Sequence, residues 1–150
     1  MSSWPTEQQL HDMSWMAIAE GASGVFYWSH DMRALGWVRD PVMHAALYRE
    51  LINVTNEIKD LEPILLRPDS QVLTVKPSED IVTREKTGPD GARYVIAYNQ
   101  SSEASLARFV LQSPAQSATV RRGMLTIEIK NGTTFEDQFA GYEAKVYEIR

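Results

Sequence analysis

The sequence predicts an α+β chain in which a helix-strand-helix unit over residues 1–66 precedes an antiparallel β-sandwich module over residues 67–150. The apolar residues recur at helical spacing up to Pro63, and at a spacing of two from Pro68 onward. All four tryptophans lie within the first 37 residues. The formal charge also divides unevenly, with 4 − 9 = −5 over residues 1–66 and 11 − 11 = 0 over residues 67–150. These differences indicate two parts built for different surroundings.

The composition excludes several classes of protein. Charged residues at 23% and hydrophobic residues at 43% are typical of a folded chain, and 150 residues suffice for one ordinary domain. Because no basic stripe is present, we expect no nucleic-acid partner. The absence of cysteine excludes a disulfide framework and a Cys-based zinc site, and indicates no particular compartment. No run approaches the roughly 20 apolar residues of a membrane span, so no membrane segment is expected.

The first predicted helix begins at a capping box. Thr6 is the expected N-cap, Gln9 can reach back to the backbone of Thr6, and the acidic Glu7 suits the positive end of a helix. An apolar stripe continues to about Glu20, and Gly21 is a natural terminator. The sequence therefore predicts a helix that ends at about residue 20.

A short apolar run follows, from Gly24 to Trp28. It carries large apolar groups on both faces, which is the pattern of a strand buried inside a parallel sheet. Such a strand needs neighbours on both edges, because each unpaired buried backbone group costs about 1–3 kcal/mol. The chain contains no plausible parallel partner. We therefore expect residues 1–66 to be the closing portion of a larger α/β barrel or sheet.

The second predicted helix follows a polar loop, residues 29–39. Asp40 is the expected N-cap and Pro41 occupies the first turn, whereas Pro63 is expected to end the helix. Apolar residues form one seam along it: Leu47, Leu51, Val54, Ile58 and Leu61.

The remaining residues alternate in the manner of short strands separated by turns. The expected strands contain Leu73 and Val75, residues 94–98, residues 106–111, residues 125–129, and Ala144 with Val146. The expected turns are residues 88–91, 99–102 and 131–132. This pattern predicts an antiparallel sandwich-like module of about 80 residues.

Two passages carry a resemblance to a known family. Residues 13–29 read MSWMAIAEGASGVFYWS and resemble the last helix-strand passage, into the eighth strand, of (β/α)8 glycoside hydrolases of the retaining, two-glutamate clan. Residues 135–147 read FEDQFAGYEAKVY and resemble the last strand of the small C-terminal sandwich of those enzymes. The resemblance implies an incomplete (β/α)8-barrel end followed by that sandwich.

The resemblance also implies a site at the carboxyl ends of the barrel strands. Trp28 matches the tryptophan that forms a hydrophobic floor under the sugar ring, although a core tryptophan in a buried strand is the alternative. Retaining hydrolysis needs two carboxyl groups about 5–5.5 Å apart. The clan supplies them from its fourth and seventh strands, which precede this sequence. We therefore expect no catalytic residue in this chain.

Other polar residues near the predicted strand are candidates for substrate contact. His30 can hydrogen-bond a sugar hydroxyl or the local backbone, and Asp31 can line a subsite or be a solvated loop residue. Glu20 precedes the strand, at the amino-terminal face of a barrel, where residues contribute to stability rather than to catalysis. His11 and His44 lie on predicted helices with no second ligand at a recognised motif spacing, so no metal is expected, and no cofactor either.

Three functions are compatible with these features. The first is the C-terminal part of a glycoside hydrolase that acts on O-glycosidic bonds, inactive alone, whose partner is a carbohydrate bound through the parent barrel. The second is an accessory module that binds carbohydrate or protein through its β surface, where Tyr94, Tyr98, Tyr142 and Tyr147 can stack on glycans or form core pairs. The third, an independent enzyme, lacks any phosphate loop, nucleophile elbow or zinc motif. Exposed apolar faces around residues 25–28 and 47–61 also predict self-association.

Overall fold

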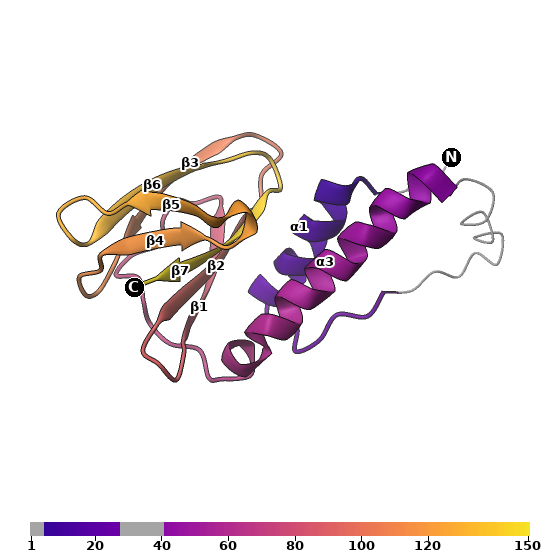
Figure 1. Cartoon of the computed structure of the whole chain (residues 1–150). Coiled ribbons are helices and arrows are strands. Elements are labelled where there is room, and N and C mark those ends of the chain that lie inside the picture. The colour runs from indigo at the N-terminus through magenta and orange to yellow at the C-terminus, as the bar shows by residue number, and fades with distance from the viewer. Residues whose placement is uncertain (1–4, 28–40) are drawn as a thin grey trace.

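The computed structural model describes residues 5–27 and 41–150, with the backbone alone for residues 41–44. A pair of helices lies side by side against one face of a β-sandwich (Figure 1). The helices are α1 (Glu7–Ala19) and α3 (Pro41–Leu65). The strands are β1 (Ile81–Thr87), β2 (Arg93–Asn99), β3 (Ser105–Val110), β4 (Ser117–Val120), β5 (Leu125–Glu128), β6 (Thr134–Phe139) and β7 (Ala144–Ile149).

Helix α1 begins and ends as its sequence predicts. The Thr6 hydroxyl accepts a hydrogen bond from the Gln9 backbone N–H at 3.1 Å, and the Thr6 N–H donates to Gln9 Oε1 at 2.9 Å. The capping box is therefore confirmed. After the helix, Gly21 adopts φ 102°, and a Cβ there would lie 2.5 Å from the Arg84 guanidinium. The backbone conformation favours glycine at this turn, whereas the Arg84 side chain is flexible enough to move away from a Cβ.

Helix α3 continues past Pro63 to Leu65, so the expected stop at Pro63 is wrong by two residues. Proline removes only one donor when it lies in the last turn. The carbonyls of that turn accept other bonds, from the Leu66 N–H to Glu62 at 3.0 Å and from the Arg67 N–H to Ile64 at 3.1 Å. The predicted apolar seam faces inward, because Val54 and Leu61 are buried and the other three members are half-buried.

The sandwich contains a five-stranded sheet, in the order β1-β2-β7-β4-β5, and a two-stranded sheet of β3 and β6. Every strand pair among the described residues is antiparallel. Strands β2, β3, β5 and β7 lie where the alternating pattern predicts them, whereas β1 and β4 were not predicted. Residues 135–147, expected to be one strand, divide into β6, a turn and β7. The expected strand at Leu73 and Val75 is reduced to a single bridge between Leu73 and Leu111.

The described residues bury two apolar cores, one on each face of the five-stranded sheet. Between the sheets lies an aromatic cluster, in which the Phe109 and Phe135 rings stack with centroids 4.6 Å apart. The other core joins the sheet to the helices and contains Trp15, Val54 and Leu61. Strand β2 serves both cores because its side chains alternate between the two faces, and residues 94–99 are consequently all buried.

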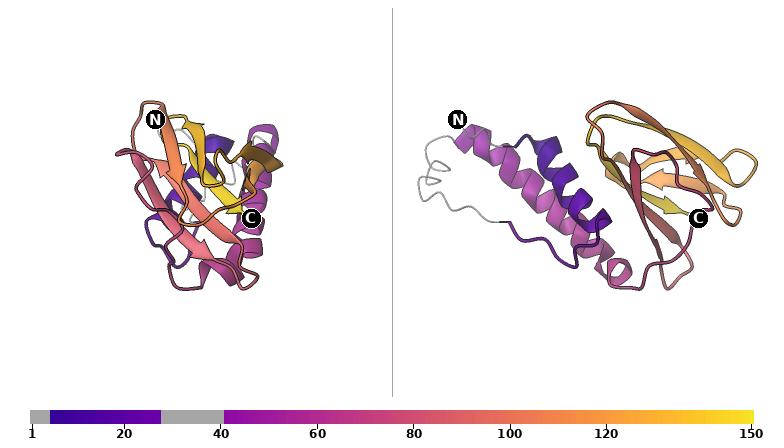
Figure 2. Two further views of the ribbon diagram at one scale, coloured as in Figure 1. Left: turned by 90° about the vertical axis from the view of Figure 1, so that its left-hand side faces the viewer. Right: turned by 180° about the vertical axis from the view of Figure 1, so that it is seen from behind.

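Residues 24–27 correct the prediction of a buried strand. They belong to no strand, Gly24 is exposed, and Phe26 exposes 82% of its surface. The physical reason is that the described chain offers no parallel strand to flank them. The segment instead extends along the helix pair on the side away from the sandwich (Figure 2). Val25 and Tyr27 are half-buried and pack against the core that the helices share with the sheet.

Candidate functional site

The three residues predicted to bind substrate, Trp28, His30 and Asp31, lie outside the described residues. The described chain leads up to Tyr27, which directly precedes Trp28. Two features near this point can bear on function. One is the extended segment 24–27 itself, and the other is a polar junction between the helices and the sandwich.

The extended segment is tied to helix α1 by a chain of hydroxyl groups. The Tyr27 hydroxyl donates to Ser14 Oγ at 2.7 Å, and the Ser14 hydroxyl donates to the carbonyl of Leu10 at 2.7 Å. Ser14 is buried, so these hydrogen bonds, rather than water, satisfy its hydroxyl. Alternation then places Val25 and Tyr27 toward the helices and Phe26 toward the opposite side. The segment has strand-like alternation, with one face covered.

A hollow of about 490 Å³ lies beside this segment, between residues 21–25, helix α3 and strand β1. Ile18, Val25 and Ile58 contribute to its apolar wall. Arg84 and Lys86 also line it, and both pair with the carboxylate of Asp69, at 2.8 Å and 2.7 Å respectively. These contacts, led by the Arg84 hydrogen bond, lower the pKa of Asp69 to about 2. Because both cations are paired with a carboxylate, the hollow is not built to bind an anion.

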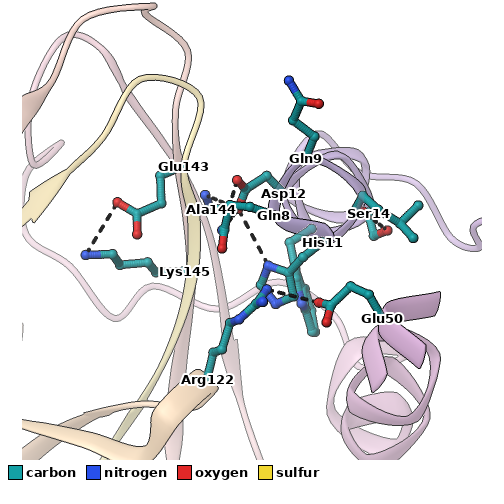
Figure 3. A network of polar contacts seen from close by, with 12 residues as sticks. Gln8, Gln9, His11, Asp12, Ser14, Glu50, Arg122, Glu143, Ala144 and Lys145 are labelled. Atoms are coloured by element: carbon teal, nitrogen blue, oxygen red, sulfur yellow. Dashed lines mark hydrogen bonds and ion pairs between the residues drawn. The ribbon is translucent and has the colours of Figure 1, made fainter. Parts of the chain in front are cut away.

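The polar junction is centred on His11 (Figure 3). This side chain is buried on α1, and its Nε2 lies 3.1 Å from Glu57 Oε2 on α3. Its Nδ1 lies 3.5 Å from Asp12 Oδ1 and makes no hydrogen bond within the described structure. Nearby, Arg122 pairs with the buried Glu50 at 3.1 Å. The junction thus joins α1, α3 and the turn η2 (Arg122–Met124).

Further donors hold the two carboxylates that flank His11. Asp12 accepts from Gln8 Nε2 at 2.9 Å and 3.0 Å, and from the backbone N–H of Ala144 on β7 at 3.0 Å. Glu57 accepts from Trp15 Nε1 at 3.2 Å. Burial disfavours the charged imidazole, but the neighbouring carboxylates of Asp12 and Glu57 outweigh it and raise the pKa of His11. Burial likewise disfavours the charged Glu57, yet its contacts with His11 and Trp15 lower its pKa.

The remaining candidates have structural surroundings. Tyr94, Tyr98 and Tyr147 are buried in the cores, whereas Tyr142 is exposed in the turn between β6 and β7. Tyr98 donates to the carboxylate of Glu20. Burial, followed by this bond, raises the pKa of Tyr98 to about 12. Glu20 therefore ties the end of α1 to the sheet.

Sequence reasoning missed the pairing of His11 with Glu57. The two residues are 46 positions apart, and helix packing alone brings them together. The available signal was weak: a histidine beside an aspartate on a predicted helix. In the part of the chain that the structure describes, no three or more acidic or histidine side chains are grouped to hold a metal ion. No helix among the described residues is long and apolar enough to cross a membrane.

Comparisons with known proteins place the fold. No protein-family model and no curated protein matches the chain. Among solved structures, a protein of Bacteroides fragilis assigned as an α-galactosidase/melibiase is 13% identical, with a TM-score of 0.65 over 99% of this chain and 30% of its own. A β-L-arabinopyranosidase of Geobacillus stearothermophilus is 13% identical, with a TM-score of 0.58 over 99% of this chain and 31% of its own.

An α-amylase of Geobacillus thermoleovorans is also similar, at 19% identity and a TM-score of 0.52, over 67% of this chain and 23% of its own. The fold is related to that of glycoside hydrolases. The chain spans less than a third of the length of each of these three proteins. The resemblance suggested by residues 13–29 and 135–147 is thus supported for the fold alone: an antiparallel sandwich with its helices, similar to part of these glycoside hydrolases.

Proposed function

We propose that this chain is the C-terminal portion of a retaining glycoside hydrolase of the two-glutamate clan. Residues 1–66 close its (β/α)8 barrel, and residues 67–150 form its small β-sandwich. One observation carries the proposal: an extended segment, residues 24–27, lies along the helix pair on the side away from the sandwich. The order helix, extended segment, helix is that of the end of a barrel.

The segment has the surfaces of an unfinished sheet strand. Its helix-facing residues, Val25 and Tyr27, are half-buried, whereas Phe26 on the other face is 82% exposed. Burying Phe26 inside a barrel is worth about 1.5–3 kcal/mol. Parallel strands on both edges add about 0.5–1.5 kcal/mol for each backbone hydrogen bond formed. A barrel interior supplies both, since its inward-facing side chains pack in layers.

The described carboxylates near the helices make contacts that stabilise the fold. Glu57 bonds His11 and Trp15, Glu50 pairs with Arg122, and Asp12 accepts from Ala144. We assign none of them a catalytic role. The catalytic pair, about 5–5.5 Å apart in a retaining enzyme, then comes from the fourth and seventh strands of the parent, as two glutamates. This chain alone is catalytically incomplete.

The residues that this chain contributes to the substrate site come directly after Tyr27 in the sequence. We assign Trp28 as the platform under the sugar ring, with His30 and Asp31 beside it. A pyranose has an apolar C–H face, and stacking on an indole adds about 0.5–1.5 kcal/mol beyond area burial, by analogy with aromatic pairs. The substrate class is a carbohydrate with an O-glycosidic bond.

The test compares this chain with the same chain joined to its upstream reading frame, on a panel of aryl glycosides. We expect hydrolysis from the longer protein alone, and a loss of turnover in its Trp28→Ala variant with an unchanged melting temperature. Hydrolysis by the 150-residue chain itself would refute the proposal. So would an upstream frame without strand-helix repeats and a glutamate pair. Polysaccharide binding by the short chain, without any such upstream frame, would favour the accessory module instead.

A further inference from the structure

The polar junction carries an inference that is independent of the proposed function. His11 is 2% exposed at the point where α1, α3 and the sandwich meet. Four charged groups surround it: Asp12 from its own helix, Glu50 and Glu57 from α3, and Arg122 from η2. On the side of β7, Glu143 and Lys145 pair with each other at 3.7 Å. The nearest partners of the imidazole are therefore two carboxylates.

Neither neutral form of the imidazole satisfies this geometry. A neutral ring carries one N–H and one lone pair. If Nε2 donates to Glu57, the lone pair of Nδ1 faces Asp12 Oδ1 at 3.5 Å. If Nδ1 carries the proton, the lone pair of Nε2 faces Glu57 Oε2 at 3.1 Å. Only the imidazolium carries a proton on both nitrogens and a positive charge between the two carboxylates, with Nε2 hydrogen-bonded to Glu57 and Nδ1 at ion-pair distance from Asp12.

The flanking carboxylates cannot turn away without losing other bonds. Asp12 also accepts the backbone N–H of Ala144, which anchors α1 to β7. Glu57 also accepts the indole N–H of Trp15, which anchors α3 to α1. A buried donor left without an acceptor is costly, so both carboxylates stay in place. These bonds hold both carboxylates in place beside His11 while the imidazole gains or loses its proton.

We propose that His11 is a pH-dependent latch: its imidazolium holds helix α1 against α3 and the sandwich, and loss of the proton weakens this packing. In the neutral ring, one nitrogen presents a lone pair to a carboxylate oxygen. The helix pair is then held by the remaining contacts of Asp12 and Glu57. Opening of the junction frees the side of α1 that carries Ser14 and the segment tied to it.

The direction of the pH effect follows from linkage. The pKa of His11 is raised in the folded chain, against the opposing effect of burial. A raised pKa gives stability that is complete below the unfolded pKa, about 6.5, and that is lost as pH rises through the folded value. The latch is therefore closed below the unfolded pKa of about 6.5 and opens as pH rises through the folded pKa of His11, which lies above it.

The first experiment measures melting temperature from about pH 6 to about pH 9, a range that spans the titration of a histidine with a raised pKa. It compares the chain with His11→Gln and with Lys130→Gln, which removes an exposed cation paired with Glu136. We expect the deficit of His11→Gln to shrink by at least half toward the alkaline end. Lys130→Gln should follow the unmodified chain at every pH. Parallel curves for the chain and His11→Gln would overturn the latch.

The second experiment needs no variant. Nitrogen NMR of the imidazole distinguishes a ring protonated on both nitrogens from either neutral tautomer. In the unmodified chain, we expect the change from the doubly protonated ring to a neutral tautomer to be centred above the unfolded pKa of about 6.5. A change centred at or below that value would overturn the proposal even if His11→Gln does not fold.

Discussion

Asp12 is the residue whose replacement tests the packing of the helices on the sandwich most sharply. Asp12→Ala removes the acceptor of the buried Ala144 N–H, and an unsatisfied buried donor costs about 1–3 kcal/mol. It also removes the anion 3.5 Å from His11 Nδ1 and the acceptor of the Gln8 side-chain amide, and a lost hydrogen bond costs about 0.5–1.5 kcal/mol. The two effects overlap, so we expect a total of about 3 kcal/mol. For a chain of this size, that corresponds to a fall in melting temperature of roughly 6–12 °C.

Thermal unfolding followed by circular dichroism measures this fall. Asp60→Ala on α3 is the matched control, because Asp60 is exposed and a surface substitution changes stability by about 0.5 kcal/mol or less. Asp12→Asn keeps an acceptor oxygen for Ala144 and loses the charge, so it should fall between the two. Equal melting temperatures for Asp12→Ala and Asp60→Ala would refute the proposed anchoring of α1 to β7.

Three further substitutions probe the other contacts. Tyr27→Phe should lower the unfolding free energy by about 0.5–1.5 kcal/mol, because the bond to Ser14 is lost. In a protein that already carries Ser14→Ala, the same substitution should have little further effect, and additive losses in this double-mutant cycle would exclude the bond. The lowered pKa of Asp69 gives stability that is present above the unfolded value of about 3.9 and is lost as pH falls through about 2. Asp69→Asn should abolish this acid dependence of the unfolding free energy. The free energy involved is less than about 1 kcal/mol because Asp69 is half exposed, and an unchanged dependence on acid pH would contradict the assignment. We propose that the isolated chain self-associates through exposed apolar groups; Phe26→Ser should lower its mass by light scattering, whereas an unchanged mass would exclude Phe26 from the contact.

Local signals explain the elements that were predicted well. The Thr6 and Gln9 capping box sets the start of α1 by contacts within four residues, and the helical stop at Gly21 depends on its own φ. The turn between β1 and β2, residues 88–91, likewise follows its Gly-Pro-Asp-Gly sequence. Such features need no tertiary partner, so the sequence alone suffices to predict them.

Features that depend on distant partners were predicted less well. The run Val25-Phe26-Tyr27 reads as buried on both faces, but burial requires neighbouring strands, and the described chain supplies only helices on one side. Strand β4 is four residues long and mixes polar with apolar positions, so its alternation is too brief to recognise. The bond from His11 to Glu57 arises only when α1 packs on α3.

Amide hydrogen exchange at Val25, Phe26 and Tyr27 is the most direct test of the proposed barrel end. It should be measured in the 150-residue chain and in the same chain joined to its upstream frame. If the segment is completed by parallel strands, the longer protein should slow exchange at these amides by about 100-fold or more, since core strands open only with large free energies. Equal exchange in the two proteins would contradict the account.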